Sequence, residues 1–316
     1  MISILVTGKI PTEALELLKS NSQFQVSYLP GLSSSELEVA IASAHGLIVR
    51  TETLVTEALL KKAPHLKVIC RAGIGTDNID VVACVGRGIV VMNTPAANRI
   101  STAEHTFGLI LSLAKKIPQA TALLKSGQWN QDKMIGVEIS GKTLGIIGLG
   151  NIGQRVAPRA QAFGMKVIAA DPYLDASIAK SLNIPLMPHE EVGGKADFVT
   201  LHVPLNDETT EMVDDEFLRN MKRGSFLINA SRGKVVNSSA LASALKSGHL
   251  GGAALDVFET EPLAKESPLL GLENIILTPH VAGKSKESVQ AMGLMAAESI
   301  SRFFERGIVE NAVTKN

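Results

Sequence analysis

Three side chains that could carry acid–base and anion-binding chemistry are Arg232, Glu261 and His280. Arginine offers an always-charged fork that matches a carboxylate. Histidine has the unperturbed pKa best suited to exchanging a proton with a hydroxyl group. Glu261 could hold the imidazole and favour its charged form. Reduction of a 2-oxo acid needs such a cation and such a proton donor. A nicotinamide would supply the hydride, so no metal or covalent nucleophile is required.

Each of these residues also has a purely structural interpretation. A single histidine after a strand more often caps or packs, Arg232 could be a surface residue, and Glu261 could start a helix beside Pro262. The catalytic interpretation is favoured because the three residues follow different strands of what we predict to be one sheet. The remaining histidines that receive only a structural interpretation are His45, His65, His105, His189 and His249.

A glycine-rich segment at residues 145–157 predicts a dinucleotide site, because an apolar strand leads into G-x-G-x-x-G and then into a helix. Gly148 permits the tight turn, Gly150 lets the backbone approach a pyrophosphate, and Gly153 lets the helix pack against the strand. The pyrophosphate would meet the free N–H groups at the start of that helix.

A carboxylate at the end of the next strand distinguishes between two cofactors. Asp171 lies 18 residues beyond Gly153, a spacing at which a carboxylate accepts hydrogen bonds from an adenosine ribose. It would repel a 2′-phosphate, and no lysine or arginine occupies residues 172–179 to offset that repulsion. We therefore predict NAD rather than NADP. The alternative is a structural turn followed by an unrelated surface aspartate.

Apolar runs of strand character alternate with helical patterns along the chain, which predicts βαβ units and parallel sheets. The predicted strands of the first third are residues 2–7, 25–29, 46–49, 66–70 and 89–92. Those of the remainder are residues 143–147, 166–170, 197–201, 225–229, 253–257 and 275–278. A long helical stretch over residues 101–126 separates the two halves, and a last helix covers residues 286–306.

Parallel strands end at one edge of their sheet, where ligands bind. In the second half that edge would gather Gly148, Asp171, His202-Val203-Pro204, residues 229–233, Asp256 and residues 278–280. We interpret His202 as a structural residue on the cofactor side rather than as an acid.

Composition argues against several other classes of protein. The chain has 316 residues, which is enough for two domains. It has 31 basic and 31 acidic side chains and no run of basic residues, and this balance argues against nucleic-acid binding. Cys70 and Cys84 are too few for a disulfide framework, and no CxxC or HExxH pairing supports zinc. The first residues lack the basic n-region of a signal peptide, so we expect none, and no apolar stretch approaches the roughly 18 residues of a membrane helix. We expect a soluble cytoplasmic protein.

Taken together, these residues resemble the D-2-hydroxyacid dehydrogenase family, most closely its phosphoglycerate dehydrogenase branch. The resemblance covers essentially the whole chain. Beyond the glycine motif it rests on residues 71–80 (RAGIGTDNID), 93–95 (NTP), 229–233 (NASRG), 254–258 (ALDVF) and 278–280 (TPH).

The resemblance implies an Arg/Glu/His catalytic set, which matches Arg232, Glu261 and His280. It implies an α/β fold of two doubly wound parallel-sheet domains with the active site in the cleft between them. A Rossmann-type NAD domain (residues 99–284) would be inserted into a flavodoxin-like substrate domain (residues 1–98 plus 285–316). Members of the family are typically dimers joined through their nucleotide domains, so we expect a homodimer through the NAD domain.

The resemblance also assigns binding residues. Those expected to contact NAD, besides the glycines and Asp171, are Asn151, Ile152, His202, Val203, Pro204, Ala230, Ser231, Asp256 and Gly283. Backbone N–H groups of Gly73 and Ile74 would bind the substrate carboxylate. Arg50 and Arg71, which follow neighbouring apolar strands, would bind the rest of the substrate, with solvated strand-end arginines as the alternative.

Two segments depart from the branch. Ile74 stands where the branch often has threonine, and residues 280–284 (HVAGK) differ from its usual His-Leu-Gly-Ala. The chain stops at Asn316, so we expect it to lack the serine-sensing regulatory domain that many relatives carry.

The resemblance implies oxidation of 3-phospho-D-glycerate to 3-phosphohydroxypyruvate, a step of serine biosynthesis. One alternative is the same chemistry on a smaller acid such as hydroxypyruvate, glyoxylate or a branched 2-oxo acid. Another is an NAD-sensing partner protein like the corepressors that resemble this family, although those carry additional disordered segments.

Overall fold

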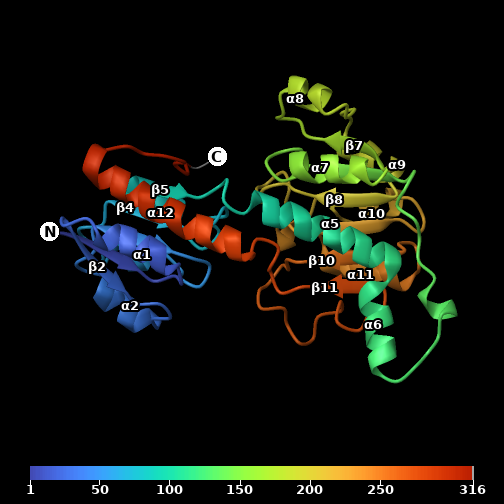
Figure 1. Ribbon diagram of the computed structural model, residues 1–316, viewed down its shortest axis with the longest axis horizontal. Coiled ribbons are helices and arrows are strands. Elements are labelled where there is room, and N and C mark those ends of the chain that lie inside the picture. Colours follow the sequence, from blue (N-terminus) through green and yellow to red (C-terminus); the bar gives the residue numbers. More distant parts are fainter. Residues whose placement is uncertain (315–316) are drawn as a thin grey trace. The chain divides into compact units, whose positions relative to one another are not determined.

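A computed structural model describes residues 1–314 of the chain, which fold as two compact units (Figure 1). Unit 1 comprises Met1–Asn98 with Lys284–Asn316, and unit 2 comprises Arg99–Gly283. The chain returns from unit 2 to unit 1 after Gly283, one residue before the predicted boundary between residues 284 and 285.

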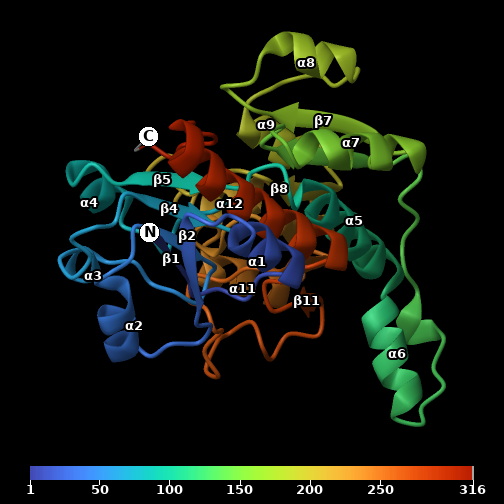
Figure 2. The same ribbon diagram turned by 60° about the vertical axis from the view of Figure 1, so that its left-hand side comes forward.

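Unit 1 is built on a five-stranded parallel sheet in the order β2-β1-β3-β4-β5, the strand order of flavodoxin-like folds. Its strands are β1 (Ile2–Val6), β2 (Phe24–Tyr28), β3 (Gly46–Val49), β4 (Val68–Arg71) and β5 (Val90–Asn93). Its helices are α1 (Thr12–Lys19), α2 (Ser34–Ile41), α3 (Glu57–Leu60), α4 (Val81–Gly86) and α12 (Lys286–Arg306). Although α12 comes from the far end of the sequence, it packs against α1 and β4 (Figure 2).

Unit 2 is built on a six-stranded parallel sheet in the order β11-β10-β9-β8-β6-β7. Leu186 forms an isolated parallel bridge with Ala169 of β7. If this bridge is counted as the third strand, the order begins 3-2-1-4-5-6, which is the Rossmann order. The strands are β6 (Thr143–Ile147), β7 (Lys166–Ala170), β8 (Phe198–Leu201), β9 (Phe226–Asn229), β10 (Gly252–Leu255) and β11 (Ile275–Leu277).

Helices cover the sheet of unit 2. They are α5 (Arg99–Lys115), α6 (Ile117–Lys125), α7 (Gly153–Ala162), α8 (Ala176–Ser181), α9 (His189–Lys195), α10 (Asp215–Asn220) and α11 (Ser238–Lys246). Two short 3₁₀ turns, η1 (Asp132–Met134) and η2 (Gly233–Val235), complete the unit. The predicted fold class, with two doubly wound parallel sheets, is confirmed.

The strands were recognisable as apolar runs because both faces of each sheet are covered. In β4, for example, Val68 and Cys70 enter one core of unit 1 and Ile69 enters the core on the opposite face. Cys84 lies in that second core, so the two cysteines are buried, separate and free. Burial raises the pKa of Cys70 to about 12 and that of Cys84 to about 11.

The helical stretch predicted over residues 101–126 consists of two helices, α5 and α6, which are divided at Lys116. Lys116 has a left-handed backbone with φ of 52°, and Pro118 lies in the first turn of α6. A proline ring inside a continuous helix would clash with the carbonyl four residues earlier. That carbonyl, on Ala114, instead accepts a hydrogen bond from the N–H of Val137 at 2.8 Å. Within residues 1–314, no helix is long and apolar enough to span a membrane.

Candidate functional site

The glycine turn between β6 and α7 shows why each glycine is needed. Gly148 has φ of +91°, and a Cβ there would lie 2.6 Å from the carbonyl oxygen of His202. A Cβ on Gly153 would lie 2.4 Å from the carbonyl oxygen of Gly148. A Cβ on Gly150, by contrast, would meet no atom within 4 Å. Two of the glycines therefore allow close packing, whereas Gly150 keeps a surface of the turn open.

The start of α7 offers unpaired donors beside that open surface. No side chain caps the helix at Ile152. Within residues 1–314, no hydrogen-bond acceptor is found for the backbone N–H groups of Asn151, Ile152 and Gly153. Exposed N–H groups at a helix start form a binding site for phosphate. This turn therefore fits the pyrophosphate of a dinucleotide.

Asp171 follows β7 and closes the same turn. One carboxylate oxygen accepts the N–H of Leu149 at 2.9 Å, and the other accepts the N–H of Tyr173 at 3.1 Å. Because each carboxylate oxygen has two lone pairs, both oxygens keep acceptor capacity for ribose hydroxyls. Asp171 therefore also holds the glycine turn, a role that its distance from Gly153 in the sequence does not indicate.

His202 follows β8 and lies against Gly148. Its Nε2 is 3.1 Å from the hydroxyl of Thr200, while its Nδ1 is buried without a hydrogen-bond partner in residues 1–314. Burial lowers the pKa of His202 to about 3. The ring is therefore neutral near pH 7 and cannot serve as a general acid there. Val203 and Pro204 continue the same segment.

Glu261 and His280 form a hydrogen-bonded pair at another part of the strand-end edge. The Nδ1 atom of His280 is 2.7 Å from Oε2 of Glu261, and Oε1 accepts the N–H of Phe258 at 3.1 Å. Burial opposes ionisation of Glu261, but the hydrogen bonds from His280 and Phe258 and the charges of His280 and Arg232 outweigh it and lower its pKa. Glu261 is therefore ionised, and the His280 side chain is 45% exposed.

Arg232 follows β9 in a turn organised by Asn229. The Asn229 side chain donates to the carbonyl of Arg232 at 2.8 Å and accepts the N–H of Ser231 at 2.9 Å. A Cβ on Gly233 would lie 1.9 Å from the carbonyl of Phe258, so this turn packs directly against the segment that leads to Glu261. The structure thus brings the three residues of the predicted catalytic set into one region of unit 2.

Several predicted cofactor contacts have protein partners of their own. Asp256 is fully buried. Its carboxylate accepts the Thr278 hydroxyl at 2.6 Å and the N–H groups of Val281 and Ala282 at 2.9 and 2.8 Å. These bonds attach it to the segment around His280 and leave no exposed surface for a cofactor. Two further predicted contacts, Ala230 and Ser231, are only 8% and 7% exposed, and Gly283 is the last residue of unit 2.

In unit 1, Asn78 organises the ends of β3 and β4. Its side-chain oxygen accepts from Nε of Arg71 at 3.3 Å, and its amide donates to the carbonyls of Arg50 and Thr53 at 2.9 and 2.6 Å. Arg71 also donates to the Thr51 hydroxyl at 3.0 Å, whereas Arg50 donates to the carbonyl of Lys9 at 3.3 Å. Asn78 lies in the motif of residues 71–80, but the sequence of this motif does not indicate that Asn78 joins the ends of the two strands.

The two predicted carboxylate-binding N–H groups differ. The N–H of Gly73 donates to the carbonyl of Arg71 at 2.8 Å, so it is already used. The N–H of Ile74 has no acceptor within residues 1–314. Gly73 has φ of +156°, and a Cβ there would overlap the Arg71 guanidinium. In this conformation the backbone N–H of Ile74 is the available donor. Gly73 is needed because a side chain there would collide with the Arg71 guanidinium.

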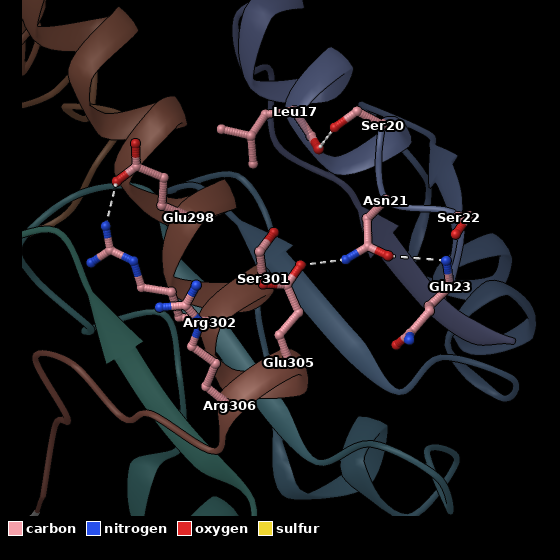
Figure 3. A pocket seen from close by; sticks show the side chains of 10 residues that line it. All are labelled: Leu17, Ser20, Asn21, Ser22, Gln23, Glu298, Ser301, Arg302, Glu305 and Arg306. Carbon is pink, nitrogen blue, oxygen red and sulfur yellow. Dashed lines mark hydrogen bonds and ion pairs between the residues drawn. The ribbon is translucent and has the colours of Figure 1, made fainter.

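A groove of about 750 Å³ lies elsewhere in unit 1, between α12 and the turn that precedes β2 (Figure 3). Its charged groups are largely satisfied within the protein: Asn21 donates to Glu305 at 2.5 Å, and Arg302 pairs with Glu298 and with Glu310. The groove lies at the amino end of β2, whereas ligands of open parallel sheets bind at the carboxyl ends. Among residues 1–314, no group of three or more histidine, cysteine or acidic side chains could hold a metal ion.

The chain is similar in sequence to known proteins. Residues 107–282 match the family described as "D-isomer specific 2-hydroxyacid dehydrogenase, NAD binding domain". The chain is 45% identical over 314 residues to a D-3-phosphoglycerate dehydrogenase of Methanocaldococcus jannaschii. That match covers 99% of this chain and 59% of the relative, so the chain spans little more than half of the relative's length.

Solved structures resemble the chain over almost its full length. The TT0316 protein from Thermus thermophilus has a TM-score of 0.91 and 35% identity, covering 99% of this chain and 100% of that one. The D-lactate dehydrogenase from Aquifex aeolicus, complexed with NAD and lactic acid, has a TM-score of 0.85 and 32% identity, covering 99% of each chain.

A Rossmann-type unit with an open glycine turn and a carboxylate at the end of the next strand is typical of a dinucleotide-binding protein. The chain belongs to the D-isomer-specific 2-hydroxyacid dehydrogenase family, and its residues 107–282 are the family's NAD-binding domain. The predicted cofactor, NAD, is thereby confirmed.

Proposed function

We propose that this chain oxidises a D-2-hydroxy acid to the 2-oxo acid, with 3-phospho-D-glycerate as the substrate and 3-phosphohydroxypyruvate as the product. The observation that supports the reaction most strongly is the 2.7 Å contact between His280 and Glu261 in the unit that binds NAD. The choice of substrate is supported by relatives such as the D-3-phosphoglycerate dehydrogenase of Methanocaldococcus jannaschii.

His280 and Glu261 together form a proton-transfer group. Because Nδ1 of His280 donates to the ionised Glu261, Nε2 carries a lone pair that can accept the proton of the substrate hydroxyl. Glu261 then stabilises the imidazolium that forms. In the reverse direction the same imidazolium returns the proton. Bound NAD would supply the acceptor for the hydride that leaves the carbon bearing the hydroxyl.

Arg232 would bind the substrate carboxylate and stabilise the negative charge that develops on the reacting oxygen. In unit 2, the open face of the glycine turn would hold the pyrophosphate and Asp171 the adenosine ribose. In unit 1, the free N–H of Ile74 would contact the carboxylate. Arg50 and Arg71, which follow the neighbouring strands β3 and β4, would supply the positive charge that a phosphate requires.

Comparison of two substrates tests the choice of acid. With NAD in excess, the wild-type chain should show a far higher kcat/KM for 3-phospho-D-glycerate than for D-glycerate. Arg50→Ala should raise KM for the phosphorylated acid by about tenfold or more, as expected for loss of a charge-assisted contact, with KM for NAD nearly unchanged. Arg87→Ala, an exposed arginine after α4, is the matched control. Equal activity on the two acids would refute the phosphate assignment.

We also propose that the chain forms a homodimer through unit 2. In both ribbon views α6 projects from the body of unit 2 (Figures 1 and 2), and none of its residues is buried. The apolar residues exposed along α6 and the segment after it are Ile117 (51%), Leu124 (58%), Trp129 (77%) and Ile135 (72%). An exposed apolar patch of this kind marks an interaction surface, and a second copy of the chain is the proposed occupant.

A further inference from the structure

Helix α5 holds both ends of the segment that carries His280. We call residues 278–282 the His280 loop. Ser101 donates its hydroxyl to the carbonyl of Ala282 at 2.8 Å, and Nε2 of His105 is 3.2 Å from the hydroxyl of Thr278. Residues four apart lie on the same face of a helix. One face of α5 therefore contacts both the first part and the last part of the loop.

The hydrogen-bond directions assign the proton of His105. The Thr278 hydroxyl donates its only proton to Asp256 at 2.6 Å, so its oxygen must act as the acceptor toward His105. Nε2 of His105 therefore carries a proton, and it also lies 3.6 Å from the same Asp256 oxygen. The remaining bonds of this buried carboxylate go to the N–H groups of Val281 and Ala282. His105, Thr278 and Asp256 form one connected network.

The His280 loop needs such support because His280 has an unfavourable backbone conformation. Its φ is 52°, in the left-handed region where the Cβ of an L-residue lies too close to the following carbonyl oxygen. Such a residue persists only where its surroundings determine its conformation. Asp256 contributes by its carbonyl, which accepts the N–H of His280 at 2.9 Å. Helix α5 is itself fixed, since Phe107, Ile110 and Leu113 are buried in the core of unit 2.

We propose that His105 is a positioning residue: through Thr278 and Asp256 it holds the His280 loop in the strained conformation that directs the imidazole to Glu261. The proposal rests on the proposed function, in which His280 exchanges the proton. It assigns a specific task to a histidine whose sequence pattern indicated only a structural role.

Three substitutions at one position provide the kinetic test. The side-chain nitrogen of Gln extends about as far as Nε2 of histidine, whereas that of Asn extends only as far as Nδ1. His105→Leu and His105→Asn should lower kcat about tenfold, within the roughly hundredfold cost of a 1 Å misplacement. KM for NAD should stay within about twofold, and His105→Gln should restore most of kcat. Unchanged kcat in His105→Leu, or equal loss in the Gln and Asn variants, would overturn the proposal.

Amide hydrogen exchange tests the network without relying on activity. Exchange of the Val281 and Ala282 amides, which donate to Asp256, should be at least several-fold faster in His105→Leu and in Ser101→Ala than in wild type. It should return toward the wild-type rate in His105→Gln. His65→Leu, a histidine of unit 1, is the control and should leave these amides unchanged.

Turnover and amide exchange together distinguish failure of the proposed function from failure of the positioning role of His105. Faster exchange in His105→Leu together with an inactive wild-type enzyme would refute the proposed function and leave the network intact. Wild-type exchange in His105→Leu would refute the positioning role, whatever the activity of the chain. If His105→Leu does not fold, the comparison of the Gln and Asn variants decides the same question.

Discussion

Around the glycine turn, single side chains serve the fold and the candidate cofactor site at once. Asp171 was predicted from its distance to Gly153, and the structure adds that its carboxylate closes the turn through the N–H of Leu149. The backbone carbonyl of His202 also lies so close to Gly148 that only a glycine fits there. Such contacts join residues that are distant in sequence, so spacing alone does not reveal them.

Desolvation of the His202 ring, whose Nδ1 is buried, makes the stability of unit 2 depend on pH. In the unfolded chain His202 binds a proton near pH 6.5, whereas in the folded chain its pKa is about 3. The unfolded state therefore binds more protons between these values. The contribution of His202 to stability is fully present above pH 6.5 and is lost as the pH falls toward 3. One pH unit below 6.5, this loss amounts to about 1 kcal/mol.

Urea unfolding at pH 7.5 and pH 5.5 measures this effect. The free energy of unfolding should fall between the two pH values by about 1 kcal/mol more in the wild-type chain than in His202→Gln. Equal pH dependence in the two proteins would show that His202 is not held neutral by burial.

At the scale of secondary-structure elements, the glycines of the turn between β6 and α7 have different roles: Gly153 allows close packing within the protein, whereas Gly150 leaves space for a ligand. Gly153→Ala would bring a Cβ against the carbonyl of Gly148 and should lower the free energy of unfolding by about 1–3 kcal/mol.

Gly150→Ala would place its Cβ in open space, so its free energy of unfolding should match that of the wild type. Because that space is where the pyrophosphate would approach, KM for NAD should rise about tenfold or more. Normal NAD kinetics in Gly150→Ala would contradict this placement of the pyrophosphate.

The order of elements was more predictable than their interruptions. Each strand of a covered parallel sheet is a short apolar run, and for this reason β3, β6 and β7 were predicted with the bounds that the structure gives. The break at Lys116 was missed because the apolar pattern continues through it, although Pro118 was a local signal. The bridge at Leu186 gave no apolar run long enough to recognise.

The candidate site was predictable to the extent that it lies at strand ends. Arg232, Glu261 and His280 were predicted to lie together because a parallel sheet gathers its carboxyl ends. Burial of Asp256 and the use of the Gly73 N–H by Arg71 could not be predicted, since both depend on how a loop folds back. The roles of Asn78 and His105 depend on tertiary contacts for the same reason.

At the scale of the whole molecule, the apolar surface along α6 predicts an assembly. Light scattering coupled to size exclusion should give twice the mass of one chain for the wild type. Replacement of both Ile117 and Trp129 by Glu should shift the mass toward that of one chain, because four charges would have to be buried at a two-fold interface. Val39→Glu, at an equally exposed apolar position of unit 1, is the control. A wild-type mass of one chain would refute the homodimer.

The central claim is that the His280–Glu261 pair transfers the proton while the glycine turn holds NAD. The most direct test compares wild type with His280→Ala by following NADH absorbance with 3-phospho-D-glycerate, and by measuring NAD binding to both proteins. The account predicts that kcat falls by about 10²–10⁴, the range typical of general acid–base catalysis, while the Kd for NAD changes little. Near-normal turnover in His280→Ala would contradict it.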